Sequence, residues 1–296
     1  MDIAPALMLS PLVPKQAGPM TRKTAKFDAS RLAVATGGTG DPAVFVHGFG
    51  SGKLVWEDVC RGLEDVFSFY AIDLPGSGES PAPKKFHYTL EHFADVLTDF
   101  IVMKDLKRLT LVGASLGAAV VLLALLRHRD ELTPRVRSLC LIDAIAYPQD
   151  PPLFFEILQT PILGPAALNF PSFVKDLPAI FLPPGYARYY GRKSVRQALV
   201  KTARLMDPER LAPYVKRLKT IRLPTLVIWG RKDGIVPLRL GRRLARDLPN
   251  ARLMVIDDCD HWPHQQCPTE VVAALKEFDQ RTSDDLRSIE SASQPT

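Results

Sequence analysis

Apolar stretches long enough for a buried strand recur along the chain, and segments of a different pattern separate them. Residues 43–48 (AVFVHG) and 109–113 (LTLVG) are examples, because neither contains a charged side chain. Continuous apolar runs of this length are typical of parallel strands that are buried on both faces of a sheet. The strands predicted in this way are 43–48, 67–73, 109–113, 136–143, 225–230 and 251–257.

The segments between these strands show the apolar spacing of helices. The predicted helices are 54–63, 90–104, 116–128, 238–247 and 269–279. Strands that alternate with helices predict a doubly wound α/β domain with a mostly parallel sheet. Ahead of this alternation, residues 26–38 (KFDASRLAVATGG) predict a short hairpin with its turn at Asp28–Ser30.

The alternation is interrupted between Tyr147 and Leu223, where no clear strand pattern occurs. The first half of this stretch is rich in proline and aromatic residues, and the second half is basic and helix-like. An insertion of this length between two core strands predicts a helical lid. The organisation we expect is an extension (1–25), a first core part (26–146), the lid (147–223), a second core part (224–280) and a disordered polar tail (281–296).

Charge constrains the partners more than the fold. The 296 residues are 46% hydrophobic and carry a formal net charge of +6. The charge is uneven, because residues 185–222 contain eleven Lys and Arg against two acidic residues. Such a segment is either a solvated basic surface or a patch that attracts anionic substrates or a membrane surface. No nucleic-acid motif accompanies it, so we expect a small-molecule substrate and no nucleic acid, and leave peripheral membrane contact and the oligomeric state open.

The cysteines and the N-terminal residues indicate the cellular compartment in which the protein is expected. Cys60, Cys140, Cys259 and Cys267 form no CxxC pair, which in a chain of this length predicts free thiols and a reducing environment. The N-terminal residues place Asp2 before the apolar positions and contain three prolines by position 14, a pattern unlike a secretory signal. We therefore expect a cytoplasmic location.

The longest uncharged run, residues 109–126 (LTLVGASLGAAVVLLALL), approaches the length of a membrane span. Its centre is Gly113-Ala114-Ser115-Leu116-Gly117, a G-x-S-x-G motif between a strand-like and a helix-like segment. In that context the motif predicts a nucleophile elbow, in which Ser115 stands on a tight turn and the glycines leave room where strand and helix crowd. We therefore predict a buried strand and a buried helix joined at a reactive serine, and no transmembrane segment.

Two further turns follow predicted strands. His47-Gly48-Phe49-Gly50 is a turn of the kind that can supply a backbone N–H to an oxyanion hole. We predict the N–H groups of Phe49 and Leu116 as the oxyanion donors, and His47 as a structural residue that holds the turn. The segment 73–80 (DLPGSGES) lacks the Lys and Ser/Thr ending of a phosphate loop, and predicts a structural turn.

A serine nucleophile needs a base, and the base needs an orienting acid. Asp233 follows the strand at 225–230, and His261 follows the strand at 251–257. The chain order Ser115, Asp233, His261 is the order expected for a Ser-His-Asp triad on a doubly wound sheet. Asp143 also follows a strand and is an alternative acid, and His264 is an alternative base. No cluster has metal-ligand spacing, so we expect no metal and no cofactor.

These motifs resemble those of the α/β-hydrolase superfamily, in particular its lid-bearing esterases. The resemblance runs from about Lys26 to Asp279, and it includes the acid loop 229–237 (WGRKDGIVP) and the histidine loop 260–268 (DHWPHQQCP). It implies the same fold, the same triad and hydrolase activity. The sequence departs from many relatives at Asp260, where they have glycine, and at Gln266, where they often have glutamate.

The resulting hypothesis is a serine hydrolase of carboxylic esters that works through an acyl-enzyme. Trp262, Phe154 and Phe155 are candidates for substrate contacts. Carbon–carbon-bond hydrolases of ring-fission products are an alternative, since they also carry tryptophan after the histidine, although they usually have asparagine where this chain has Ala114. A ligand receptor without turnover on the same fold is a second alternative, and acyl transfer or perhydrolysis is a third.

Overall fold

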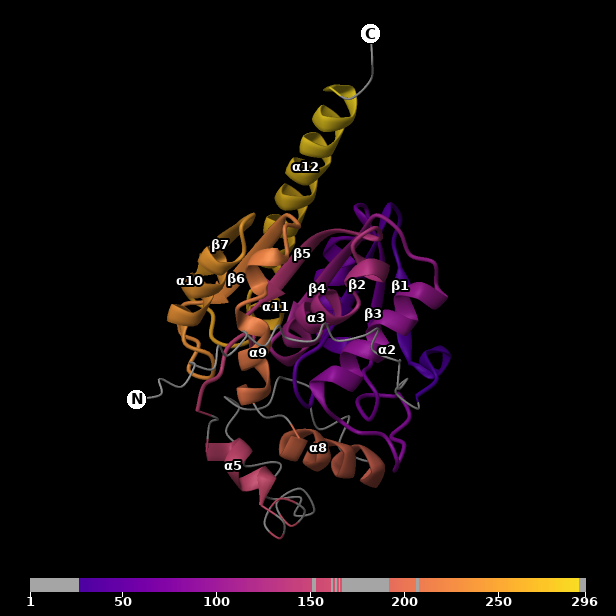
Figure 1. Cartoon of the computed structure of the whole chain (residues 1–296), viewed down its shortest axis with the longest axis vertical. Coiled ribbons are helices and arrows are strands. Elements are labelled where there is room, and N and C mark those ends of the chain that lie inside the picture. Colours follow the sequence, from indigo (N-terminus) through magenta and orange to yellow (C-terminus); the bar gives the residue numbers. More distant parts are fainter. Residues whose placement is uncertain are drawn as a thin grey trace, which may run out of the picture.

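The computed structural model describes residues 27–150, 153–160, 162, 164, 166, 192–205 and 208–292. In this part of the chain seven strands form one sheet in the order β1-β3-β2-β4-β5-β6-β7 (Figure 1). Neighbouring strands are parallel, except that β1 is antiparallel to β3. The strands are β1 (Val34–Gly37), β2 (Asp41–Val46), β3 (Phe67–Ile72), β4 (Leu109–Ala114), β5 (Val136–Ile142), β6 (Thr225–Gly230) and β7 (Ala251–Ile256).

The burial of the strands explains why they could be predicted from the apolar runs of the sequence. Every residue of β4, β5 and β6 is buried, which matches the uninterrupted apolar runs of the sequence. All six predicted strands are confirmed, but the predicted hairpin is wrong. Asp28 instead caps a short 3-10 helix, η1 (Ala29–Arg31), and β1 pairs with β3 rather than with a preceding strand.

Helices cover both faces of the sheet, as the doubly wound prediction requires. On β2, Val44 and Val46 pack into the layer formed with α2 (Leu90–Met103), α3 (Leu116–Arg127) and α10 (Leu238–Asp247). Phe45 of the same strand packs into the opposite layer, which contains residues of α1 (Glu57–Gly62) and α12 (Pro268–Ala292). Shorter helices complete this part of the fold: η2 (Lys53–Trp56), α4 (Arg129–Leu132) and α11 (Pro263–Gln266).

The apolar run 109–126 is divided between two buried elements. It forms β4 and most of α3, with Ser115 at the junction. All residues of α3 except Arg127 are buried, so its uniformly apolar surface is covered by protein. Among the described residues no helix combines the length and the apolar character that a bilayer crossing needs.

The described residues between β5 and β6 form helices and no strand. These elements are α5 (Leu153–Gln159), α8 (Lys193–Leu205), η4 (Pro208–Leu211), α9 (Ala212–Val215) and η5 (Leu218–Thr220). Helices α5 and α8 contact each other at one end of the molecule (Figure 1).

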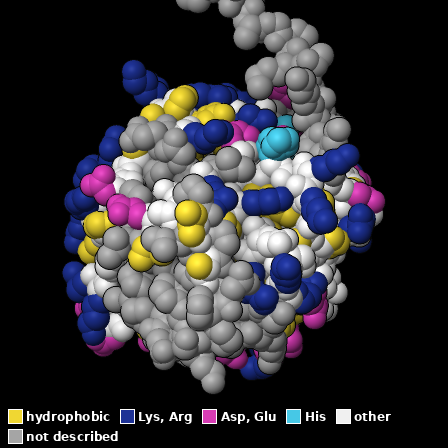
Figure 2. All heavy atoms as spheres, turned by 90° about the horizontal axis from the view of Figure 1, so that it is seen from below, with side chains coloured by type: hydrophobic (Ala, Val, Ile, Leu, Met, Phe, Trp, Pro, Cys, Tyr) yellow, Lys and Arg dark blue, Asp and Glu magenta, His cyan; other side chains and the backbone are white. Residues whose placement is uncertain are grey.

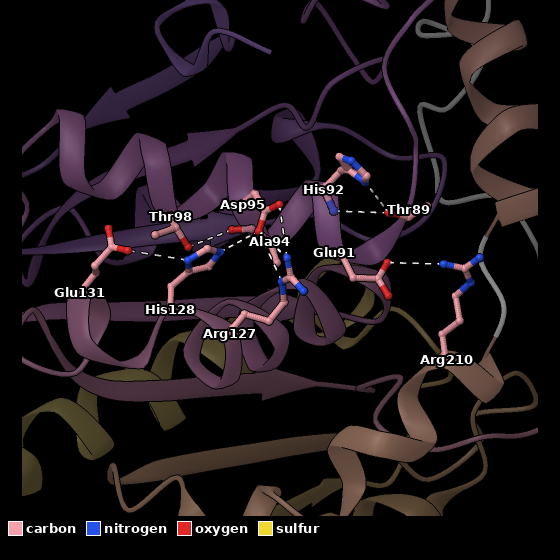
Figure 3. A network of polar contacts seen from close by, with 10 residues as sticks. All are labelled: Thr89, Glu91, His92, Ala94, Asp95, Thr98, Arg127, His128, Glu131 and Arg210. Atoms are coloured by element: carbon pink, nitrogen blue, oxygen red, sulfur yellow. Dashed lines mark hydrogen bonds and ion pairs between the residues drawn. The ribbon is translucent and has the colours of Figure 1, made fainter. Parts of the chain in front are cut away.

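A polar network ties α2 to α3 and to this insertion (Figure 3). Asp95 of α2 accepts hydrogen bonds from Arg127, at 3.1 Å, and lies 2.7 Å from Nε2 of His128 at the end of α3. Arg210 of η4 lies 3.9 Å from Glu91 of α2. The insertion is therefore held to the core helix that packs beside α3.

The C-terminal helix is longer than expected. Residues 281–292 belong to α12, so the prediction of a disordered tail from residue 281 was wrong over that range. Polar side chains support the helix through contacts one turn apart, such as Arg281 with Glu277 at 2.7 Å. Thr282 is buried and its hydroxyl donates to the carbonyl of Phe278 at 2.8 Å. The predicted extension 1–25 and residues 293–296 lie outside the described residues.

Candidate active site

Ser115 stands on a strained turn between β4 and α3. Its backbone angles are φ 52° and ψ −115°, in the left-handed half of φ that side-chain-bearing residues rarely adopt. Its N–H donates to the carbonyl of Ile142 at 2.8 Å, which fixes the turn to the end of β5. A Cβ atom on Gly117 would lie 2.1 Å from the carbonyl oxygen of Val46, so only glycine fits there. This is the geometry of the predicted elbow.

The structure brings Ser115, His261 and Asp233 together. Nε2 of His261 lies 2.9 Å from Oγ of Ser115, and Nδ1 of His261 lies 2.9 Å from Oδ2 of Asp233. All three residues are buried. They follow the carboxyl ends of β4, β7 and β6, which meet at one edge of a parallel sheet, where open α/β folds place their ligand sites.

Backbone amides orient the carboxylate of Asp233. Its Oδ1 atom accepts hydrogen bonds from the N–H groups of Ile235 and Val236, each at 2.8 Å. The Oδ2 atom is thereby turned toward His261. A carboxylate held in this way fixes the tautomer of the imidazole, so that Nδ1 carries the proton and Nε2 can accept one from the serine.

The turn at residues 47–50 lies directly against the serine. A Cβ atom on Gly48 would be 3.3 Å from Cβ of Ser115. His47 holds the turn, because its Nε2 accepts from the N–H of Leu74 at 3.1 Å and its Nδ1 donates to the carbonyl of Gly48 at 2.7 Å. Burial lowers the pKa of His47 and favours the neutral ring that this arrangement needs. The structural role predicted for His47 is confirmed.

The 73–80 segment is a structural turn, as predicted. Asp73 is fully buried and accepts from Nζ of Lys53 at 2.9 Å and from the N–H of Glu79 at 2.8 Å. Gly78 has φ 48°, and a Cβ atom there would lie 2.2 Å from the Asp73 carboxyl carbon. The glycines of this segment thus close the turn around an aspartate.

A cavity opens beside Ser115, and four of the predicted site residues line it. Phe49 and Trp262 line it, and Leu116 is the first residue of α3. The rings of Trp262 and His261 are T-shaped to each other, with 5.6 Å between centroids. The lining residues are Gly48, Phe49, Ser51, Ala114, Ser115, Ile145, Ile235, His261, Trp262 and His264. The side chains of Phe154 and Phe155 lie outside the described part of the structure.

The two alternative residues occupy other positions. His264 stacks on Trp56 with ring centroids 4.5 Å apart, and burial lowers its pKa to about 3, so it is a neutral residue of the cavity wall. Asp143 is completely buried, and its Oδ1 accepts from the N–H of Gly230 at 3.0 Å. Ser115 is hydrogen-bonded to His261 and His261 to Asp233, so neither alternative takes the place of His261 or Asp233 in that chain.

One cluster has the composition of a metal site, which the sequence did not reveal. Single oxygen or nitrogen atoms of Asp143, Asp233 and His261 all lie within 4.8 Å of one another. The hydrogen bonds of Asp233 already engage both of its oxygens and the Nδ1 atom of His261. These atoms are therefore engaged with each other, and we assign the cluster to the chain of hydrogen bonds that starts at Ser115 rather than to a metal.

The cysteines depart from the expectation of four free thiols. Cys259 and Cys267 form a disulfide across the loop that carries His261, with Cα atoms 6.6 Å apart. Gln266 closes the same loop by accepting from the N–H of Asp260 at 3.0 Å. Cys60 and Cys140 are free and buried, and burial raises the pKa of the Cys60 thiol to about 12. The prediction was wrong for one pair and holds for the other.

Comparison with known proteins shows the family to which the chain belongs. A model of the alpha/beta hydrolase fold matches residues 41–266, and the chain belongs to that family. A pimeloyl-[acyl-carrier protein] methyl ester esterase of Neisseria meningitidis is 29% identical over 250 residues, which are 79% of this chain and 91% of that protein. A 2-hydroxy-6-oxononadienedioate/2-hydroxy-6-oxononatrienedioate hydrolase of Cupriavidus pinatubonensis is 28% identical over 77% of this chain and 82% of its own.

A solved structure agrees with the sequence relatives. The thermophilic esterase of Thermogutta terrifontis, in a malate-bound form, superposes with a TM-score of 0.66 at 25% identity. The match covers 85% of this chain and 93% of the esterase. The fold and the hydrolase class follow from these likenesses.

Proposed function

We propose that the chain is a serine hydrolase that cleaves carboxylic esters through an acyl-enzyme. The observation that carries this proposal is the pair of hydrogen bonds, each of 2.9 Å, that join Ser115 to His261 and His261 to Asp233. A hydroxyl becomes a nucleophile when a neutral imidazole accepts its proton and a carboxylate stabilises the resulting imidazolium. Catalytic roles for Ser115, His261 and Asp233 follow from that chemistry.

The first half of the reaction forms the acyl-enzyme. Oγ of Ser115 attacks the ester carbonyl carbon while Nε2 of His261 takes the hydroxyl proton. The N–H groups of Phe49 and Leu116 hold the negative charge that develops on the carbonyl oxygen, and the N-terminal end of α3 adds a favourable dipole. The bond to the alcohol then breaks, and the alcohol leaves with the proton from His261.

The second half releases the acid. His261 takes a proton from water, and the resulting hydroxide attacks the acyl carbonyl carbon. The bond to Oγ breaks as His261 returns the proton to Ser115. The enzyme is regenerated, and one water is consumed for each ester cleaved.

The substrate contacts are also proposed. Trp262 lines the cavity and presents an apolar surface next to His261, which suits an apolar acyl or alcohol group. We propose that residues 147–223 form a lid over this cavity and that Phe154 and Phe155 face the substrate. Lys and Arg side chains are spread around this face of the molecule, with apolar and acidic side chains among them (Figure 2). We propose that their positive charge favours an anionic substrate or a membrane surface.

We also propose a cytoplasmic location, which is supported by two free cysteines rather than by the four expected from the sequence. It now rests on Cys60 and Cys140 as buried thiols, because Cys259 and Cys267 are bonded to each other. Labelling of free thiols under denaturing conditions, immediately on cell lysis, tests it. Four labelled cysteines would favour a reducing compartment, and two would favour an oxidising one.

Carbon–carbon-bond cleavage is the second candidate function. It is favoured by Trp262 beside His261 and by the likeness to the Cupriavidus hydrolase of 2-hydroxy-6-oxo dienedioates. Ala114 precedes the serine, where an asparagine would offer an additional hydrogen-bonding side chain. Ester cleavage needs no such side chain, and we therefore prefer ester cleavage to carbon–carbon-bond cleavage as the proposed function.

The decisive experiment is hydrolysis of p-nitrophenyl esters from acetate to dodecanoate by the wild type and by Ser115→Ala. We expect the substitution to reduce kcat by roughly 10³-fold or more. Ser77→Ala is the matched control, because Ser77 lies in the 73–80 turn and does not line the cavity. Equal activity of wild type and Ser115→Ala would refute the role of the serine.

The same assay separates the alternatives. If all variants are inert toward esters, a ring-fission diketone tests carbon–carbon cleavage. If that substrate is also inert but ligands raise the Tm, the chain is a receptor. Products formed with added alcohol or peroxide reveal acyl transfer or perhydrolysis.

A further inference from the structure

Two aspartates share the interior of the site, and the mechanism uses one of them. Asp143 and the side chain of Asp233 are both fully buried. Asp143 follows β5, the strand between β4, which leads to Ser115, and β6, which leads to Asp233. Its backbone has φ 43°, and its N–H donates to the carbonyl of Ile228 at 3.0 Å. The carboxyl group is thus held at a fixed place beside the triad.

The two carboxyl groups have different hydrogen-bond partners. Asp233 receives two backbone N–H groups on Oδ1 and Nδ1 of His261 on Oδ2. Asp143 receives one backbone N–H, from Gly230, on Oδ1. Its Oδ2 atom is buried and accepts no hydrogen bond from a donor among the described residues, while the Asp233 carboxylate lies within hydrogen-bonding reach of the Asp143 carboxyl group. Three donors therefore stabilise a negative charge on Asp233, and one donor does so on Asp143.

The charges around Asp143 are unfavourable for a second carboxylate. The charged groups that act on it are the acidic Asp233 and Asp260, with His261 next to them. The neighbouring cations are turned to other partners, because Arg231 pairs with Asp257 at 2.6 Å and Lys232 with Asp258 at 3.0 Å. Two carboxylates this close in a buried site cannot both be ionised. Burial, followed by the charge of Asp233, raises the pKa of Asp143 well above its ordinary value.

We propose that Asp143 is a protonated positioning residue, whose Oδ2–H donates a hydrogen bond to the carboxylate of Asp233. This proposal rests on the proposed triad function. The proton stays on Asp143 through the reaction, so the pair carries one negative charge and no proton is gained or lost. Asp143 then helps to fix the orientation of Asp233, and through its hydrogen bond from Gly230 it ties the ends of β5 and β6 together.

The hydrogen bond also sets how strongly the triad holds a proton. A donor to Asp233 withdraws part of the negative charge that would otherwise stabilise the imidazolium of His261. Without that donor, Asp233 would stabilise a positive charge on His261 more strongly, which opposes the role of His261 as a base. Asp143 thus affects both the geometry of the triad and the acid limb of the pH–rate profile.

Two substitutions at Asp143 separate a protonated acid from an ionised one. In Asp143→Asn the amide oxygen can accept from Gly230 and the amide nitrogen can donate to Asp233, and the group is neutral at every pH. We expect kcat/KM within about 3-fold of wild type and an unchanged acid limb. Asp143→Ala removes both bonds, so we expect a loss of roughly 10- to 100-fold in kcat/KM and an acid limb displaced to higher pH.

A spectroscopic measurement tests the proton without relying on activity. The infrared spectrum at neutral pH should contain the C=O stretching band of a protonated carboxylic acid, and Asp143→Asn should lose it. Asp257→Asn, at an exposed aspartate, is the control that keeps the band. Absence of the band in the wild type would overturn the proposal.

The outcomes also distinguish this proposal from the proposed function. If Asp143→Asn is folded but as inactive as Asp143→Ala, Asp143 acts as a carboxylate and the proposal fails. Identical pH profiles of the wild type and both variants would refute it as well. Failure of Ser115→Ala and Asp233→Ala to reduce activity would instead remove the triad, whatever the infrared band shows.

Discussion

At the scale of single residues, the position of the Ser115 side chain depends on a backbone conformation that its neighbours impose. A positive φ at a residue with a side chain is unfavourable by about 1–3 kcal/mol. At Ser115 the surrounding hydrogen bonds over-determine it, because the N–H donates to Ile142 and the carbonyl accepts from Ala118 at 3.1 Å. Gly117 makes this possible by letting the start of α3 approach β2 closely.

Glycine at position 117 should therefore be irreplaceable, whereas Gly234 should not. A Cβ atom at Gly117 would meet the backbone oxygens of Val46 and His47 at 2.1 and 2.6 Å, and these atoms cannot move without distorting β2. We expect Gly117→Ala to destabilise the protein by about 2 kcal/mol or more and to abolish activity. A Cβ atom at Gly234 meets nothing within 4 Å, so Gly234→Ala should leave the Tm unchanged or slightly raised. Thermal unfolding of both variants checks this, and equal Tm values would contradict it.

At the scale of elements, the two halves of α12 contribute differently to the stability of the protein. Its first half contributes Val271, Leu275 and Phe278 to the core layer beneath the sheet. Its last turns extend away from the body of the molecule (Figure 1) and carry contacts within the helix, such as Arg287 with Asp284. Closer to the core, Ser283 still accepts a hydrogen bond from Arg137 at 3.1 Å. Core and extension should therefore respond differently to the same substitution.

Leucines in the two halves provide a matched pair. Leu275 is fully buried, and Leu275→Ala should lower the free energy of unfolding by about 2–5 kcal/mol. Leu286 is half-buried in the extended part, and Leu286→Ala should change it by about 0.5 kcal/mol or less. Urea denaturation of the two variants measures both values. Comparable losses would mean that the extended half also packs against the core.

Elements that bury a continuous apolar surface were predictable from the sequence. Strands β4 to β6 and helix α10 match their predicted ranges within about a residue or two. Their buried positions are visible in the sequence as continuous apolar runs in the strands and as apolar residues at helical spacing in the helix. The last turns of α12 were missed because polar contacts such as Arg281 with Glu277 support them without an apolar stripe. The grouping of Ser115, His261 and Asp233 could be predicted from motifs at strand ends. The closeness of Asp143 to Asp233 and the bond between Cys259 and Cys267 could not, since both depend on distances between loops.

At the scale of the whole molecule, buried ionisable groups set the pH dependence of stability, and they act with opposite signs. His47 and His264 have lowered pKa values, that of His264 being about 3, whereas the unfolded chain binds a proton at each near pH 6.5. Because the unfolded state binds more protons, stability is lost as the pH falls from about 6.5. Asp143 has a raised pKa, so the folded state binds the extra proton, and its contribution is lost as the pH rises above about 4.

Substitution should isolate these two opposing contributions. With His264→Gln the fall in the free energy of unfolding between pH 6.5 and 4 should become shallower, by up to about 1.4 kcal/mol per pH unit. His87→Gln, at an exposed histidine, is the control and should keep the wild-type slope. Asp143→Asn needs no proton to remain neutral, so relative to wild type it should gain stability from pH 4 to 8. Urea titrations across this range measure all four proteins. If Asp143→Asn instead lost stability toward pH 8 relative to wild type, then Asp143 would be ionised in the folded state, and the charge distribution inferred for the site would have to be reversed.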